Sequence, residues 1–289
     1  MSVAVSTHAE RTFSASFMQF ATLQFFVQKA IIQHMTEKQW QSFAVFRKSF
    51  RKKVTEWNSH APRLIPLAAA AAEKDTPPYP LKTAVVYNRA LDDVTPSDDI
   101  RYFIIGDNPG KDEQRAQNNR YLVGASGKLG ERFFRLTPEL CADFRKNTVI
   151  LNKTPVHTAK TKHLAALSRH DTEIAQLITD SQIWMAQQTA LLHQAFVAHA
   201  APNDHIPELW LVGYAELRHT GICVPYRDAL RSAYAEKSAA WEHVFVYQHF
   251  SMNRFTIDLN EWRRHHPDAD SITALAEIGV FHRKDIFGA

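Results

Sequence analysis

Four short apolar segments, separated by long helical stretches, restrict the fold of this 289-residue chain most strongly. They span residues 101–105, 147–151, 208–212 and 243–247, and each has the length and the β-branched or aromatic content of a buried strand. Neighbouring parallel strands need a crossover long enough to hold a helix, and the stretches between these segments have that length. We therefore expect a three-layer αβα fold around a central four-stranded, mainly parallel sheet.

Helical periodicity is clearest in three other stretches. Residues 13–58 carry apolar side chains at helical spacing and predict two or three amphipathic helices. Residues 171–199 predict one long helix, with Asp171 or Thr172 as its N-cap. Residues 271–278 predict a capped C-terminal helix, and we expect the last residues, HRKDIFGA at 282–289, to form a tail or an edge strand.

The composition changes in residues 61–80, where prolines cluster around an alanine tract. This stretch is the best candidate for a linker, although a short helix could lie inside it. We therefore expect a helical N-terminal extension with its linker over residues 1–80, packed on the core, and an α/β domain over residues 81–289.

Composition and residue spacing favour an anionic partner and give no sign of a membrane, secreted or metal-binding protein. The formal net charge of +4 and the pI near 9.0 favour an anionic partner such as nucleic acid. No apolar run approaches the roughly 20 residues of a membrane span, and the first residues lack the pattern of a signal peptide. Cys141 and Cys223 form no CxxC pair, and the histidines have no metal-ligand spacing. We expect a cytoplasmic monomer, associated with the nucleoid if the protein is bacterial, without a membrane partner, a metal or a cofactor.

Polar residues follow three of the four predicted strands. Gly106–Gly110 (GDNPG) stops the first strand and places Asn108 at its carboxyl end. Asn152 follows the second strand, and His249 follows the fourth. Ligands of open α/β sheets bind at the carboxyl edge of the strands, so these three side chains are expected to converge on one site.

Three motifs at these strand ends resemble the uracil-DNA glycosylase superfamily. GDNPG at residues 106–110 is similar to the GxNPG signature of the mismatch-specific and single-strand-selective branches. RYLVGASGKL at residues 120–129 resembles the PFVGxSGxL segment of the thermostable branch. HFSMNRF at residues 249–255 occupies the place of the HPS-type motif, with Phe250 at the position of the proline. The resemblance covers residues 101–255 and implies a DNA repair enzyme that flips uracil or another deaminated base out of DNA.

The resemblance implies that Asn108 and His249 are the catalytic residues. Asn108 matches the Asn that holds the attacking water, and because an amide is not a strong general base, its part would be orientation. His249 matches the histidine that donates a hydrogen bond to O2 of the departing uracil anion. The lack of a lysine at the motif positions favours a monofunctional enzyme, which hydrolyses the N-glycosidic bond and leaves an abasic site.

A base-binding set follows from the same resemblance. Tyr121 matches the aromatic residue on which the flipped base stacks, and Asn152 matches the Asn that reads the polar edge of uracil. The Asn152 amide would discriminate poorly against cytosine if it were free to flip, and well if its orientation were fixed. Gly106, Asp107 and Gly110 complete the set. Gly110 stands where the strict uracil enzymes carry a tyrosine, so we expect a wider range of bases.

A DNA-binding set lies beside these residues. We expect Ser126 to cap a helix that starts near Gly127, and the N–H groups of that helix could bind a DNA phosphate; a cap alone is an equally good interpretation. Met252 stands near the place of the wedge residue that fills the gap left by a flipped base. The complete expected set is Ser126, Gly127, Lys128, Ser251, Met252 and Arg254.

Other interpretations stay open. The degenerate third motif is compatible with a catalytically weak or inactive DNA-binding or damage-sensing protein of the same fold. A hydrolase or transferase for a small anionic ligand would require a nucleophile elbow or a metal cluster, and the sequence has neither. Taken singly, Asn108 could be a turn residue, Tyr121 a packed aromatic residue and His249 a partly buried histidine.

Overall fold

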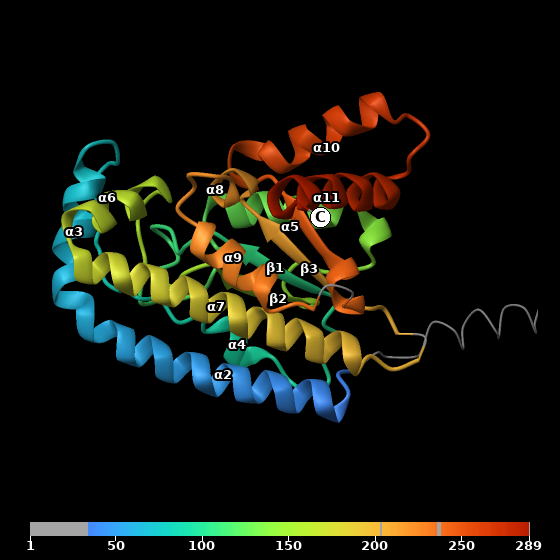
Figure 1. The fold of residues 1–289 in the computed structure, drawn as a ribbon, viewed down its shortest axis with the longest axis horizontal. Coiled ribbons are helices and arrows are strands. Elements are labelled where there is room, and N and C mark those ends of the chain that lie inside the picture. Colours follow the sequence, from blue (N-terminus) through green and yellow to red (C-terminus); the bar gives the residue numbers. More distant parts are fainter. Residues whose placement is uncertain (1–33, 203, 236–237, 289) are drawn as a thin grey trace, which may run out of the picture. The chain divides into compact units, whose positions relative to one another are not determined.

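A computed structural model describes residues 34–202, 204–235 and 238–288 (Figure 1). Met35–Ala289 forms one compact unit. The helical pattern predicted for residues 13–33 lies outside the described residues.

The central sheet is four-stranded and parallel, as expected for this α/β fold. It consists of β1 (Tyr102–Gly106), β2 (Thr148–Asn152), β3 (Glu208–Val212) and β4 (Val244–Tyr247), which pair in the order β2-β1-β3-β4, and every pairing is parallel. All four carboxyl ends therefore lie at one edge. The predicted strands are confirmed to within one residue at each end.

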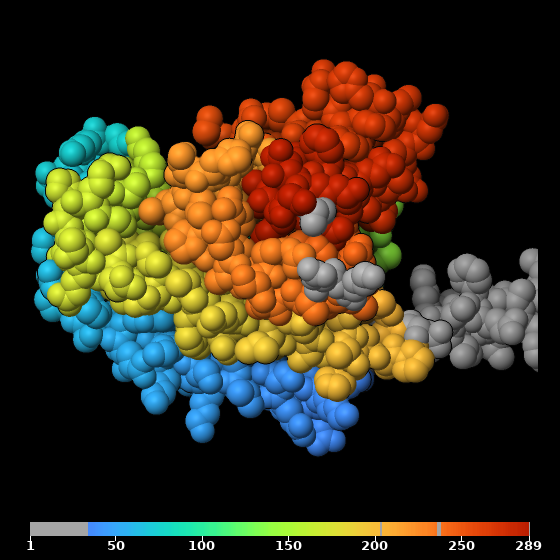
Figure 2. Space-filling view, in the orientation of Figure 1, coloured from blue at the N-terminus to red at the C-terminus, as the bar shows by residue number. Residues whose placement is uncertain are grey.

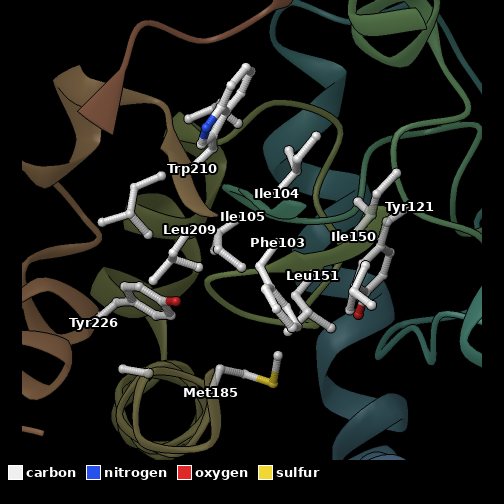
Figure 3. Close-up of a cluster of buried hydrophobic side chains, with 14 of the residues drawn as sticks. Phe103, Ile104, Ile105, Tyr121, Ile150, Leu151, Met185, Leu209, Trp210 and Tyr226 are labelled. Carbon is white, nitrogen blue, oxygen red and sulfur yellow. The ribbon is translucent and has the colours of Figure 1, made fainter. Parts of the chain in front are cut away.

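One face of the sheet packs on a pair of helices, α7 (Thr172–Ala198) and α9 (Val224–Ser232). Phe103 on β1 contacts the Phe196 ring of α7, with 5.0 Å between ring centroids, and Met185 of α7 belongs to the same buried cluster (Figure 3). Asp171 accepts hydrogen bonds from the backbone N–H groups of Glu173 and Ile174, so the predicted N-cap of this helix is confirmed.

The opposite face is covered by α5 (Ala125–Leu136), α10 (Arg254–His265) and α11 (Ser271–Phe287). Trp210 on β3 contacts Phe134 of α5 and Phe255 of α10. Gly279 of α11 lies so close to β4 that an added Cβ would be 2.9 Å from Phe245 Cβ. The predicted tail or edge strand is wrong, because α11 continues through Phe287 and buries Ile286 in the core.

Two of the longer helices in the described part of the chain come before β1. A capping box of Thr36 and Gln39 starts α2 (Glu37–Trp57). This helix lies along α7 (Figure 2). The rings of Phe50 and Trp184 stack between the two helices, with 6.0 Å between their centroids. The predicted linker is instead largely helix, since α3 (Ala61–Glu73) packs on α6 (Lys162–His170). Alanine has the highest helix propensity, and a proline in the first helical turn removes an N–H that has no helical partner.

The remaining elements are short. They are η1 (Asn58–His60), α4 (Ala90–Asp93), η2 (Pro138–Leu140), α8 (Tyr214–Leu217), η3 (Ala239–His243) and η4 (Ser251–Asn253). Of the helices in the described ranges, none has the length and apolar character needed to cross a membrane.

Candidate functional site

A cavity of about 540 Å³ opens at the carboxyl edge of the sheet. Its wall includes Asp107 and Asn108 after β1, Asn152 at the end of β2, Gly213 after β3 and His249 after β4. Asn108, Asn152 and His249, which the sequence assigns to the ends of three different strands, therefore lie in one cavity. The parallel sheet order explains why residues so far apart in the chain meet there.

Asn108 is held by its amide nitrogen. Nδ2 donates to Thr158 Oγ1 at 2.9 Å and to the Val156 carbonyl at 3.3 Å. The Thr158 hydroxyl in turn donates to the Lys160 carbonyl at 2.9 Å, which fixes its own direction. Within the described part of the chain Asn108 Oδ1 has no hydrogen-bond donor, so this oxygen is available to accept a hydrogen from a molecule in the cavity.

The loop that carries Asn108 is anchored from behind. His157 is 1% exposed, and burial lowers its pKa to about 4, so the ring is neutral at pH 7. Its Nδ1–H donates to the Pro109 carbonyl at 2.8 Å, and its Nε2 accepts from the Tyr79 hydroxyl at 2.9 Å. This pair of bonds ties the GDNPG loop to the segment after β2, and the position of Asn108 is thereby fixed.

His249 presents one ring nitrogen to the protein and leaves the other to the cavity. Nδ1 accepts the backbone N–H of Ser251 at 3.0 Å and lies 2.7 Å from Ser251 Oγ. Burial lowers the pKa of His249, and the charge of Lys153 also lowers it, while that of Asp107 raises it. A neutral ring whose Nδ1 accepts must carry its proton on Nε2, so Nε2–H is a hydrogen-bond donor at neutral pH.

Asn152 covers Gly106 on the neighbouring strand. The two residues are paired in the register of β1 and β2, and a Cβ at position 106 would stand 2.5 Å from Asn152 Oδ1. Asn152 is 1% exposed, and its Nδ2 has no hydrogen-bond partner of regular geometry in the described structure. The amide also acts on the Glu113 carboxyl group, and because an NH₂ group has two hydrogens, Nδ2 keeps a hydrogen that a ligand of this cavity would satisfy.

A buried ion pair lies under the same edge. Lys153 is fully buried, and its Nζ donates to Asp107 Oδ1 and to the Val212 carbonyl, each at 2.6 Å. Gly213 has a φ of +102°, and a Cβ there would be 2.2 Å from Asp107 Oδ1. Asp107, which was expected to bind the base, lines the cavity but gives one carboxyl oxygen to Lys153. Sequence reasoning missed Lys153, since a lysine after a strand is usually exposed.

A second buried carboxyl group, Glu113, was also missed. Glu113 is 6% exposed and lines the cavity, and its Oε2 accepts the backbone N–H of Gly110 at 3.3 Å. Burial raises the pKa of Glu113 to about 7, although the N–H groups of Gly110 and Leu122, the amide of Asn152 and the charge of Arg145 act in the opposite direction. It lies in a polar loop without periodicity, where nothing in the sequence distinguishes it from the neighbouring charged residues.

The expected stacking role of Tyr121 is wrong in this structure. Tyr121 is 1% exposed among the core side chains (Figure 3), and its hydroxyl donates to the Val86 carbonyl at 2.6 Å. The next residue, Leu122, lines the cavity instead and has a φ of 52°. Arg145 Nη2 donates to the Leu122 carbonyl at 2.5 Å and supports this left-handed backbone. Both residues belong to the buried core, but of the two only Leu122, which is 3% exposed, also lines the cavity.

The start of α5 differs from its prediction. Gly124 is the N-cap, no side chain caps the helix, and Ser126 lies in the first turn, where it lines the cavity. Gly127 packs tightly, because a Cβ there would be 1.4 Å from the Leu122 carbonyl oxygen. Lys128 is exposed and lines a different cavity. Glycine is an adequate N-cap, so no capping serine is required.

The segment after β4 brings polar and apolar residues to the rim. Ser251 and Arg254 line the cavity, and Met252, with a φ of 53°, has an 86% exposed side chain. Phe250, which replaces the proline of the motif, is buried and stacks on Phe255 with ring centroids 4.9 Å apart. The expected DNA-binding set is therefore divided: Ser126, Ser251 and Arg254 line the cavity, whereas Gly127, Lys128 and Met252 do not.

The described residues contain no group of three or more His, Cys, Asp or Glu side chains that could hold a metal ion. Cys141 is exposed, Cys223 is buried, and both are free thiols.

Fold and site together define an α/β protein with a polar cavity at the carboxyl edge of a four-stranded parallel sheet. No protein-family model matches the chain, and no curated protein matches it significantly.

Proposed function

We propose that this chain is a monofunctional DNA glycosylase, which flips uracil or another deaminated base out of DNA and hydrolyses its N-glycosidic bond. One observation carries the proposal. Three polar atoms without a regular hydrogen bond in the described structure, Asn108 Oδ1, Asn152 Nδ2 and His249 Nε2, belong to side chains that line a single cavity. A donor–acceptor set of this kind suits a flat polar base and a water molecule.

The chemistry of the bond assigns a role to each catalytic side chain. Cleavage develops positive charge on the deoxyribose and negative charge on the departing base. The His249 Nε2–H group would stabilise the negative charge on O2 of the base. Asn108 Oδ1 would accept a hydrogen from a water and direct its oxygen to C1′. The water adds hydroxyl to C1′, and its remaining proton neutralises the released base anion.

The walls of the cavity support a base as the ligand. Leu122 lines the cavity next to the position where the family motif has an aromatic residue, and Asn152 Nδ2 supplies a donor for a base carbonyl. A Cβ at Gly110 would have no atom within 4 Å. This open space favours a substrate range wider than uracil, with hypoxanthine, xanthine and mismatched thymine as further candidates.

The rim supports DNA as the larger partner. Arg254 and Ser126 are positioned at the cavity, where they would contact phosphates, and the chain as a whole has a net charge of +4. Met252 is exposed in a left-handed turn next to the cavity residue Ser251, as a wedge residue would be.

The test is a panel of oligonucleotides that carry uracil, hypoxanthine, xanthine or mismatched thymine, in single- and double-stranded form. Hot alkali after incubation reveals abasic sites. Asn108→Ala and His249→Ala should lower single-turnover cleavage by about 10²–10⁴-fold with nearly unchanged DNA affinity. The exposed residues Asn260 and His265 provide matched controls, and their alanine variants should cleave as the wild type does.

Two outcomes would contradict the enzyme. The first is a wild type that yields no abasic site on any of these substrates. The second is cleavage that Asn108→Ala and His249→Ala leave unchanged, because the activity would then arise elsewhere. Salt-dependent DNA binding without product would indicate the damage-sensing alternative, which the buried Phe250 in the third motif favours.

A further inference from the structure

The orientation of the Asn152 amide decides which base edge it can read. Uracil presents O2, N3–H and O4 in sequence, which are an acceptor, a donor and an acceptor. Cytosine presents O2, N3 and the 4-amino group, so its last two positions are reversed. Rotation of an asparagine amide by half a turn exchanges its donor and acceptor and would exchange the two preferences. Selectivity therefore requires something that prevents this rotation.

We propose that Glu113 is a positioning residue that sets the base specificity of the cavity, because its carboxylate prevents the Asn152 amide from flipping. The inference rests on the proposed function and deepens it. The substrate class that it assigns is the lactam bases, in which a ring N–H is adjacent to a carbonyl group. The disfavoured class is the amino bases, cytosine and adenine.

The contacts of Asn152 give its amide a direction. Oδ1 lies over Gly106 of β1, and the amide also interacts with the Glu113 carboxyl group. In the order β2-β1-β3-β4, β1 is on the side of Asn152 that faces β4 and His249. From β4 toward β2 the polar atoms are then the donor His249 Nε2–H, the acceptor Asn152 Oδ1 and the donor Asn152 Nδ2. This order matches O2, N3–H and O4 of uracil.

Glu113 is held as a hydrogen-bond acceptor. Its carboxyl group receives the backbone N–H groups of Gly110 and Leu122, which lie near the two ends of the connection between β1 and α5. A flipped Asn152 would turn its carbonyl oxygen from Gly106 to this carboxylate, and two acceptors would then face each other without a proton. The ionised carboxylate therefore disfavours the flipped amide, whereas a protonated carboxyl could donate to it and would tolerate it.

The charge state of Glu113 makes the selectivity depend on pH. Burial raises the pKa of Glu113 to about 7, against the charge of Arg145 in the turn before β2. The buried Tyr121 ring lies near it; burial raises the pKa of that phenol, and the charge of Glu113 raises it further. Further charged or titratable groups that line the cavity are Asp107, Lys160, Glu216, His249 and Arg254. Since the pKa of His249 is lowered, His249 stays mainly neutral above about pH 6.5.

The first experiment compares single-turnover excision of uracil and cytosine by the wild type and by Glu113→Gln. Glutamine has nearly the same shape, but its amide can donate or accept and so no longer opposes the flip. The uracil-to-cytosine ratio should fall by about tenfold or more in Glu113→Gln. In the wild type it should rise roughly fourfold from about pH 6.5 to about pH 8.5, as the carboxylate forms. The exposed Glu139 provides the control variant, Glu139→Gln.

A second measurement is independent of turnover. The side-chain NH₂ signals of Asn152 in a ¹⁵N correlation spectrum, assigned by their loss in Asn152→Asp, should titrate near pH 7 in the wild type and not in Glu113→Gln. The positioning role is refuted if the uracil-to-cytosine ratio is the same in wild type and Glu113→Gln, or if the Asn152 signals do not shift with pH. The glycosylase proposal stands in either case. If the wild type releases no base, the proposed function fails, and the NMR titration alone decides whether Glu113 controls Asn152.

Discussion

At alkaline pH, Glu113→Gln should have a higher free energy of unfolding than the wild type. Burial raises the pKa of Glu113 from its ordinary value of 4.5 to about 7, so the folded chain binds this proton more tightly than the unfolded chain does. The stabilisation is complete below pH 4.5 and is lost as the pH rises through 7. It corresponds to about 3 kcal/mol of unfolding free energy, because one pKa unit is about 1.4 kcal/mol.

A comparison of the two proteins isolates this effect from the buried histidines. Burial lowers the pKa values of His157 and His193 to about 4, so their contribution to stability is complete above pH 6.5 and is lost as the pH falls through 4. Both proteins contain these histidines. Their effect therefore cancels in the difference between wild type and Glu113→Gln, although it shapes both individual curves.

The assay is urea unfolding of the wild type, Glu113→Gln and the exposed control Glu139→Gln, at a series of pH values between about 5 and 8.5. The difference between wild type and Glu113→Gln should change by about 2.5 kcal/mol in favour of Glu113→Gln across this range. Half of this change should be complete at about pH 6, between the unfolded and the folded pKa of Glu113. The control should follow the wild type. A difference that is constant with pH would show that Glu113 does not carry a raised pKa in the folded chain.

Two further predictions follow from the contacts at the sheet edge. Lys153→Met should lower the unfolding free energy by about 3–5 kcal/mol, because Asp107 would be left as an unpaired buried charge. Adding Asp107→Asn in the same chain should restore part of the loss, and denaturant unfolding measures both effects. If the effects of the two substitutions simply add, Lys153 and Asp107 are not coupled. Leu122→Ala should weaken base excision, because Leu122 lines the cavity. Tyr121→Phe removes the hydrogen bond to the Val86 carbonyl, so it should lower the unfolding free energy by about 1–2 kcal/mol and leave excision unchanged. A Tyr121→Phe protein with normal stability but impaired cleavage would contradict the packing assigned to Tyr121.

Much of the fold was readable from local patterns. The segment 208–212 is β3 with the same bounds, and the other strands differ by one residue at most. Each is a short β-branched or aromatic run with polar or glycine residues after it, so the signal lies within the strand itself. Asn108, Asn152 and His249 could be assigned to one cavity because parallel strands place their carboxyl ends at one edge.

The errors came from segments whose structure depends on distant partners. The predicted linker is mostly α3 because its alanine-rich face packs on α6, and the predicted tail is helix because α11 packs on β4. Tyr121 and Leu122 are adjacent in an irregular loop, where no periodicity shows which of the two buried residues lines the cavity. The backbone around them is set by Arg145, which is more than twenty residues away.

The sequence by itself determined the strand pattern, the parallel class of the sheet and the polar residues that stop the strands, since these are properties of neighbouring residues. Only the tertiary structure decided the chemical state of the site. Burial raises the pKa of Glu113, Lys153 after β2 pairs with Asp107 after β1, and the Asn108 amide donates to Thr158. Desolvation and hydrogen-bond partners depend on what surrounds a side chain in space, and local sequence does not contain that information.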